Sequence, residues 1–253
     1  MTTPFAVRFG GERTARAVKV GQNADLTAYL SAIGLHGPGP AMVVVGGAAG
    51  LDPDGLEQLR PVFRESLVSV AKRLDAFVID GGTDVGVMRL LGRARSALGA
   101  SFPLIGVAAF ATVTIPGQEP MRSDAAPLEP HHSHFLLVPG DDWGDEAPWL
   151  ADTASALARA APSVTVLVNG GEVAYDDVAH SVAANRPTIV VAGTGRTADQ
   201  LVAAINGETT EERARALVAS GLVRVAGPVD DPDSVAAALS AALSPVQDPP
   251  VSS

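Results

Sequence analysis

The chain has 253 residues, of which 47% are apolar and only 4% aromatic, so it is long enough for one large α/β domain with an aliphatic core. Its 18 basic and 28 acidic residues give a net charge of −10, which argues against a nucleic-acid-binding or acidic-membrane surface. The chain has no cysteine, which excludes disulfides, thiolate zinc sites and a cysteine nucleophile.

The N-terminus has no signal-peptide pattern, and no apolar run approaches the length that spans a membrane. We therefore expect a cytoplasmic protein with neither a membrane nor a nucleic-acid partner. Any anion that it binds must be captured locally, by particular arginines and backbone amides.

The first forty residues predict a β-hairpin followed by a short helix. The strands are expected at Phe5–Phe9 and Ala15–Val20, and the helix near Ala24–Ile33. We expect one domain over residues 1–244, with residues 1–40 as an extension of it. Residues 245–253 are expected to form a disordered tail.

From Met42 onward, apolar runs alternate with amphipathic segments. The runs predict buried strands at Met42–Val45, Phe77–Ile79, Leu104–Ala109, Phe135–Val138, Val164–Val168, Thr188–Val191 and Leu222–Val225. Apolar residues at helical spacing predict helices at 56–74, 87–98, 151–161, 175–184, 197–205 and 233–243. Between Thr112 and Trp149 the chain is expected to be irregular and functional. The alternation predicts a mainly parallel sheet covered by helices on both faces.

Three helix starts carry more specific predictions. Pro61 is expected in the first turn of its helix, since a proline deeper inside would break it. Thr83 or Asp84 is placed to cap the helix at 87–98. Thr197 and Gln200 match a capping box that opens the helix at 197–205.

Four of the predicted strands end in glycine-rich turns. Glycine lets the backbone turn sharply and approach a ligand, and the free N–H groups of a following helix favour an anion. Such turns lie at the carboxyl ends of parallel strands, where α/β proteins bind ligands. None matches G-x-G-x-x-G or the Walker pattern. The sequence predicts a nucleotide- or phosphate-binding crevice formed by Gly46, Gly47, Gly81, Gly82, Thr83, Gly86, Gly170, Gly171, Glu172, Gly193, Thr194, Gly195 and Arg196.

Polar side chains near these turns suggest further roles. Arg196 is suited to a two-pronged contact with a phosphate, the alternative being a surface salt bridge. We expect His132 and His134 to order their loop or contact the ligand, and no metal, because two ligands without a third make no zinc site. Asp176 and Asp177 suit acid/base work or a ribose diol, or simply the dipole of their helix.

Three segments, in order, resemble one family. Gly81-Gly82-Thr83-Asp84-Val85-Gly86-Val87-Met88 resembles the Gly-Gly-Thr-x-x-Gly-Val-Met segment in the cytoplasmic N-terminal domain of TRPM-type cation channels. Leu128-Glu129-Pro130-His131-His132-Ser133-His134-Phe135 resembles its Leu-Asp-x-x-His-Ser/Thr-His-Phe, and Gly193-Thr194-Gly195-Arg196-Thr197-Ala198-Asp199 its Gly-Ser-Gly-Arg-x-Ala-Asp. The chain therefore resembles a stand-alone bacterial member of the SLOG superfamily (the LSDAT group), which joins DprA/SMF proteins, LOG phosphoribohydrolases and the TRPM sensor domain.

The resemblance covers roughly Met42 to Ile205. It implies a Rossmann-like, doubly wound fold that binds nucleotide-derived ligands, ADP-ribose among them in some channel members. It also implies a homodimer and no required cofactor other than the nucleotide. The residues that it nominates for the phosphates are Arg196, Gly193, Gly195, Gly81, Gly82 and Thr83.

The enzymatic LOG relatives carry Pro-Gly-Gly-x-Gly-Thr-x-x-Glu, and this chain departs from that motif. Val173-Ala174 replaces the Gly-Thr, and Asp177 replaces the glutamate, which withdraws the carboxylate by one methylene. Our leading hypothesis is therefore a non-catalytic sensor of an ADP-ribose-like ligand. The alternative is a nucleotide N-glycosidic phosphoribohydrolase that uses Glu172, Asp176 or Asp177. DNA handling by analogy with DprA is a weaker third hypothesis, against which the net charge counts.

Overall fold

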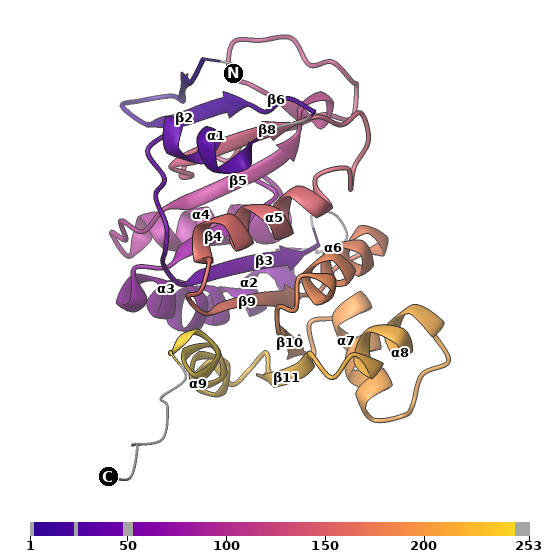
Figure 1. The fold of residues 1–253 in the computed structure, drawn as a ribbon. Helices are drawn as coiled ribbons and strands as arrows, with labels where there is room; N and C mark the ends of the chain where they lie inside the picture. The colour runs from indigo at the N-terminus through magenta and orange to yellow at the C-terminus, as the bar shows by residue number, and fades with distance from the viewer. Residues whose placement is uncertain (1–2, 23–24, 48–52, 246–253) are drawn as a thin grey trace, which may run out of the picture.

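A nine-stranded sheet forms the centre of the protein in the computed structural model, which describes residues 3–22, 25–47 and 53–245 (Figure 1). The strand order is β1-β2-β8-β5-β4-β3-β9-β10-β11. The strands are β1 (Phe5–Arg8), β2 (Thr14–Lys19), β3 (Ala41–Gly46), β4 (Phe77–Asp80), β5 (Leu104–Ala109), β8 (His134–Val138), β9 (Ser163–Val168), β10 (Thr188–Ala192) and β11 (Val223–Pro228). Two short strands, β6 (Val113–Thr114) and β7 (Ala126–Pro127), pair with each other separately.

The β1–β2 hairpin is antiparallel, and the other neighbouring strands of the large sheet pair in parallel. Most of the parallel strands are joined by connections that contain an α-helix, and such a connection returns the chain to the same end of the sheet before the next strand begins. The predicted α/β fold with a mainly parallel, Rossmann-like sheet is therefore confirmed.

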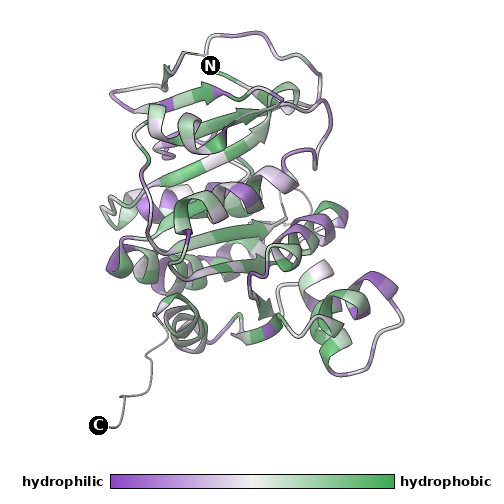
Figure 2. Cartoon of the chain, in the orientation of Figure 1, coloured by the Kyte–Doolittle hydropathy of each residue, from purple (hydrophilic) through white to green (hydrophobic). Residues whose placement is uncertain are grey.

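Helices cover both faces of the sheet. Those on one face are α1 (Leu26–Ala32), α5 (Ala147–Ala158), α6 (Glu172–Ala183) and α7 (Arg196–Ile205), with α8 (Glu212–Ala219) packed beside α7. Those on the other face are α2 (Pro53–Pro61), α3 (Ser69–Leu74), α4 (Gly86–Ala97) and α9 (Pro232–Leu243). Figure 2 shows the apolar colour concentrated on the strands between these two layers.

Strand β3 shows how one short run of residues serves both cores. Val43 and Val45 pack into the cluster under α5 and α6, whereas Met42 and Val44 pack into the cluster under α4 and α9. Side chains alternate across a strand, so a strand buried on both faces must be apolar throughout. A third cluster joins the hairpin to β8 through residues such as Val7 and Phe135.

The path of the chain reverses direction beside β3. From β3 the chain proceeds outward through β4, β5 and β8, then returns to place β9 on the other side of β3, followed by β10 and β11. The carboxyl ends of β3 and β9 therefore flank a topological switch point, the position at which open α/β sheets bind ligands.

Several local predictions about helices are wrong. Pro61 ends α2 inside a continuous helical stretch, which goes on through a π-helical segment, Val62–Val68, into α3. The wider π turn changes the hydrogen-bond register next to the proline, which has no N–H to donate. Val85, rather than Thr83 or Asp84, is the N-cap of α4, and Asp84 instead bonds Arg89.

The C-terminal third contains two further differences. The capping box is wrong, because α7 begins one residue earlier and the Thr197 hydroxyl donates to the carbonyl of Gly171. The sequence patterns also missed α8. Among the described residues, no helix combines the length and apolarity needed to cross a membrane. The predicted disordered tail lies outside the described residues from 246 onward.

Candidate functional site

The glycine turns that the sequence singled out lie at the carboxyl ends of four adjacent parallel strands, β4, β3, β9 and β10. Gly46 of β3 is paired with Val168 of β9, so the turns after these two strands start side by side. The predicted residues fall into two groups. One follows β3 and β4 (Gly46, Gly47, Gly81, Gly82, Thr83, Gly86), and the other follows β9 and β10 (Gly170, Gly171, Glu172, Gly193, Thr194, Gly195, Arg196).

A pocket of about 720 Å³ opens beside the second group. The first turns of α6 and α7 supply one part of its lining, which includes Gly171, Glu172, Tyr175, Arg196, Thr197 and Gln200. The segment that leads into α8 supplies the rest, from Thr209 to Arg213. A hydrogen bond of 2.8 Å from the Thr209 hydroxyl to Gln200 Oε1 ties this segment to α7. Three helix N-termini therefore meet at one pocket, an arrangement that favours an anion.

Arg196 lies directly against the turn after β9. A Cβ placed on Gly171 would lie 2.8 Å from Nη2 of Arg196, so the guanidinium occupies the space that a side chain would take. Arg196 has a positive φ of 54° and follows Gly195, whose φ is 87°. Glycine at 171 and 195 thus allows the arginine to begin α7 with its side chain beside the first turn of α6.

The turn after β10 is closed by its own aspartate. The N–H groups of Gly193 and Gly195 donate to the two carboxylate oxygens of Asp199, at 2.8 and 3.0 Å. Thr194 bonds the backbone N–H of Asn169, at 2.8 Å, and so links this turn to the one after β9. These glycine amides are engaged inside the protein, so a ligand in the pocket meets the Arg196 side chain instead of them.

The turn after β4 rests on a buried row of three ionisable residues. His132 Nε2 lies 2.8 Å from Asp80 Oδ1, and His132 Nδ1 lies 2.9 Å from Glu129 Oε2. Asp80 Oδ1 also accepts the N–H of Gly82 at 2.7 Å, and the Gly82 carbonyl accepts the N–H of Glu129. The row therefore fixes the Gly81-Gly82-Thr83 turn through direct hydrogen bonds.

Electrostatics keeps this row charged. Burial opposes a positive charge on His132, but the carboxylates of Asp80 and Glu129 outweigh it and raise the pKa of His132 to about 9. Burial opposes a negative charge on Glu129, but its hydrogen bonds with His132 and His131 and the charge of His132 lower the pKa of Glu129 below its usual value. Thr83, expected to contact phosphate, is buried here and its hydroxyl has no hydrogen-bond partner in the described residues.

His134 is placed differently. It is the first residue of β8, at the amino end of that strand, and its Nδ1 lies 2.8 Å from the hydroxyl of Ser133. Burial, with the nearby charge of Arg16, lowers the pKa of His134 to about 4. His132 and His134 therefore belong to different surroundings, one charged and one neutral at pH 7.

Comparison with known proteins identifies the family. The family model described as "SLOG in TRPM, prokaryote" matches residues 39–237. The chain belongs to this family. It is also similar to a transient receptor potential cation channel subfamily M member-like 2 protein of Nematostella vectensis, at 27% identity over 241 residues, covering 78% of this chain. Subfamily M member 2 of Rattus norvegicus is 27% identical over 233 residues, covering 74%. The match spans only 15% of the length of each channel.

Within this SLOG chain, the three candidate catalytic carboxylates do not converge. Glu172 lines the pocket and pairs with Arg213, whereas neither Asp176 nor Asp177 is among the described residues that line it. Asp177 Oδ1 is buried without a hydrogen-bond partner in the described part of the chain. Burial first, then the charges of Glu146 and Asp176, raise the pKa of Asp177 well above its usual range. Asp177 is therefore harder to ionise than an ordinary aspartate, which disfavours a role as a base or nucleophile.

Sequence reasoning missed several residues that shape the SLOG site. Asp199 and Glu129 stand inside the quoted motifs, so their position was a usable signal, but their hydrogen bonds depend on the fold. Asp80 is the last residue of β4, and nothing in the sequence pattern marked it as a partner of His132. Arg213 lies in the unpredicted α8, and no motif marked it.

Proposed function

We propose that this SLOG chain binds a nucleotide-derived ligand of the ADP-ribose type and acts as a sensor that leaves the ligand intact. The observation that carries the proposal is Arg196 packed over Gly171 at the mouth of a pocket where three helices begin. A guanidinium next to helix N-termini provides charge-assisted donors for a phosphate. The pocket volume, about 720 Å³, lies in the range typical of small-molecule sites.

The hydrolase alternative has less support from the geometry. Splitting an N-glycosidic bond needs a positioned acid or base next to the ribose. The Glu172 side chain is 82% exposed and paired with Arg213, and burial raises the pKa of Asp177 well above its usual range. We therefore favour binding without cleavage.

The test is isothermal titration of the protein with ADP-ribose, NAD and AMP, with mass spectrometry of each recovered mixture. Saturable binding with an intact ligand supports the sensor. New products that disappear in Asp177→Asn would establish the hydrolase instead, and no heat with any of the three would remove the proposal.

Arg196→Ala identifies the site within the same experiment. We expect a loss of affinity of at least about tenfold, the effect of removing a charge-assisted hydrogen bond to phosphate. Arg224→Ala, which removes an exposed arginine on the edge strand β11, is the matched control and should bind normally. Equal affinity in both variants would exclude Arg196 from the site.

We further propose that the protein works in the cytoplasm as a homodimer. The resemblance of its motifs to the cytoplasmic N-terminal domain of TRPM-type channels and the lack of cysteine support the location. Light scattering of the purified protein checks the dimer, and a monomer at micromolar concentration would exclude it.

A further inference from the structure

Arg213 reaches across the pocket from the helix that the sequence patterns missed. It is the second residue of α8, and its Nη2 lies 2.6 Å from Oε2 of Glu172 in the first turn of α6. Its Nε lies 3.3 Å from Glu211, and its guanidinium lies 4.2 Å above the ring of Tyr175. Arg213 thus adds side-chain contacts between α8 and α6, two helices that also pack against each other.

The pocket lining therefore contains two arginines, which come from different helices. Arg196 begins α7, next to Gly171, and Arg213 comes from the α8 side. Each planar guanidinium can bind one phosphoryl group with two parallel hydrogen bonds. Two such groups in one pocket match a ligand with two linked phosphoryl groups better than a monophosphate.

Glu172 is an ion-pair partner of Arg213 in the pocket lining. The pair is exposed, with 82% of the Glu172 side chain and 48% of the Arg213 side chain accessible to solvent. An exposed ion pair of this kind contributes little stability, so a more highly charged phosphoryl group can replace the carboxylate. The pocket lining also contains three glutamates, Glu172, Glu211 and Glu212. Their negative charges repel a second anion unless an arginine neutralises the charge of that anion.

We propose that Arg213 selects ligands with a diphosphate, and that Glu172 competes with the second phosphoryl group for it. This inference rests on the proposed function, since it assigns the second phosphate of the ligand that Arg196 binds. The diphosphate ligand breaks the Glu172 pair and binds Arg213 through its second phosphoryl group.

The test is isothermal titration of four proteins with ADP-ribose and with AMP: the wild type, Arg213→Gln, Glu172→Gln and the double variant. We expect Arg213→Gln to weaken ADP-ribose binding by about tenfold and to change AMP binding little. Glu172→Gln should strengthen ADP-ribose binding several-fold, because it removes the competing charge. In the double variant that gain should disappear, since the two residues act on each other.

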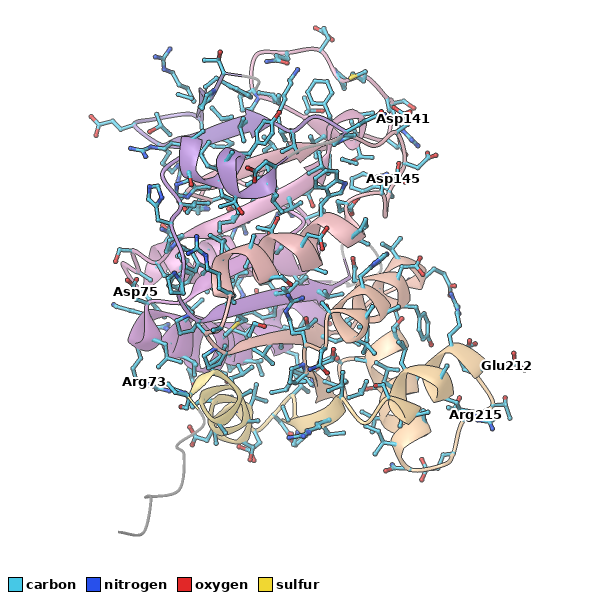
Figure 3. The ribbon with its side chains drawn as sticks, viewed as in Figure 1. Arg73, Asp75, Asp141, Asp145, Glu212 and Arg215 are labelled. Atoms are coloured by element: carbon cyan, nitrogen blue, oxygen red, sulfur yellow. The ribbon has the colours of Figure 1, made fainter. Side chains whose placement is uncertain are left out.

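Arg215→Gln is the matched control. Arg215 lies on the same helix but lines a separate groove on the outer side of α7 and α8. Figure 3 shows Arg215 and Glu212 projecting from α8, at the edge of the molecule remote from the hairpin. Circular dichroism should show the same helix content in all variants.

The possible outcomes separate the two proposals. If Arg213→Gln weakens both ligands equally or neither, or if Glu172→Gln brings no gain, the selectivity inference is overturned while the proposed function stands. If the wild type binds neither ligand, the proposed function fails and the inference fails with it.

Discussion

His132 shows how one buried side chain can couple protonation to the geometry of the glycine turn after β4. It is completely buried between two carboxylates, and one of them, Asp80, also holds the N–H of Gly82. An imidazolium in this position can donate to both neighbours at once, which the neutral ring cannot do. The turn after β4 is therefore best ordered when His132 is protonated.

Stability should consequently fall on the alkaline side. The folded pKa of His132, about 9, is higher than the unfolded value near 6.5. Its contribution is complete below about pH 6.5 and is lost as the pH rises through 9. We expect the free energy of unfolding, measured with urea, to decrease over this window, and the decrease to be much smaller in His132→Gln.

The control is His180→Gln, because His180 is an exposed residue of α6. It should retain the alkaline decrease of the wild type. Since His132→Gln can also impair folding, the ring titrations of the wild-type histidines provide an independent readout by NMR. We expect a pKa of about 9 from the titration of the His132 ring and a pKa of about 4 from that of the His134 ring. A pKa below 6.5 for His132 would contradict the assignment.

For individual residues, the sequence could nominate members of the site but could not predict their hydrogen-bond partners. Arg196 was nominated by its motif, and the structure places it at the pocket beside Gly171. Whether the glycine amides are available to a ligand could not be read from the chain, because that depends on Asp199 turning back onto Gly193 and Gly195. A side chain four residues away can fill a site that composition alone leaves open.

Among the elements, α4 depends on a glycine that its helix propensity disfavours. Gly92 lies in the middle of the helix, and a Cβ there would lie 2.1 Å from Oε2 of Glu129. The helix thus packs closely against the carboxylate that bonds His132. Position 92 requires glycine because the Glu129 carboxylate fills the space that a Cβ would occupy.

Gly92→Ala should therefore destabilise the protein although alanine is the better helix former by about 1 kcal/mol. Glu129 cannot move without breaking its bonds to His132, so we expect a net loss on the order of 1–3 kcal/mol in the free energy of unfolding. Ser96→Ala, at an exposed position of α4, should be neutral or slightly stabilising. A Gly92→Ala protein as stable as the wild type would show that α4 can shift away from Glu129.

The strands of the large sheet were predictable because most of them are short apolar runs, whereas the short strands β6 and β7, several helix starts and one whole helix were not. Pro61 is tolerated deep in a helix because a π-helical segment follows it, and no local pattern signals such a segment. Helix α8 escaped notice because Ala214 is its only described residue that is fully buried, which leaves no apolar stripe to detect.

For the whole molecule, the alternation of strands and helices predicted the α/β class, while the strand order came only from the structure. The return of the chain to β3 puts the pocket toward one edge of the sheet, near β10 and β11, and leaves the β1–β2 hairpin at the other edge (Figure 1). Ligand binding should therefore stabilise the β10–β11 side of the sheet more than the side of the hairpin.

Hydrogen exchange with and without ADP-ribose can measure this difference. We expect slower exchange in the turns after β9 and β10, in residues 206–211 and in α8, and unchanged exchange in the β1–β2 hairpin. A ligand at 100 times its dissociation constant should also raise the free energy of unfolding by about 2.7 kcal/mol. Protection confined to the turns after β3 and β4 would place the ligand in the other group of glycines.

The pairing of β9 with β3 has a consequence for the order in which the protein folds. Ala41 pairs with Ser163, about 120 residues later, and closing so long a loop carries a large entropic cost. The strands from β3 to β8 are closer in sequence, so we expect them to assemble first and to offer β3 as a template for β9. All the described residues that line the pocket follow β9 in the sequence, so we expect the pocket to form last. A partly folded chain that lacks this part of the sheet would not bind the ligand.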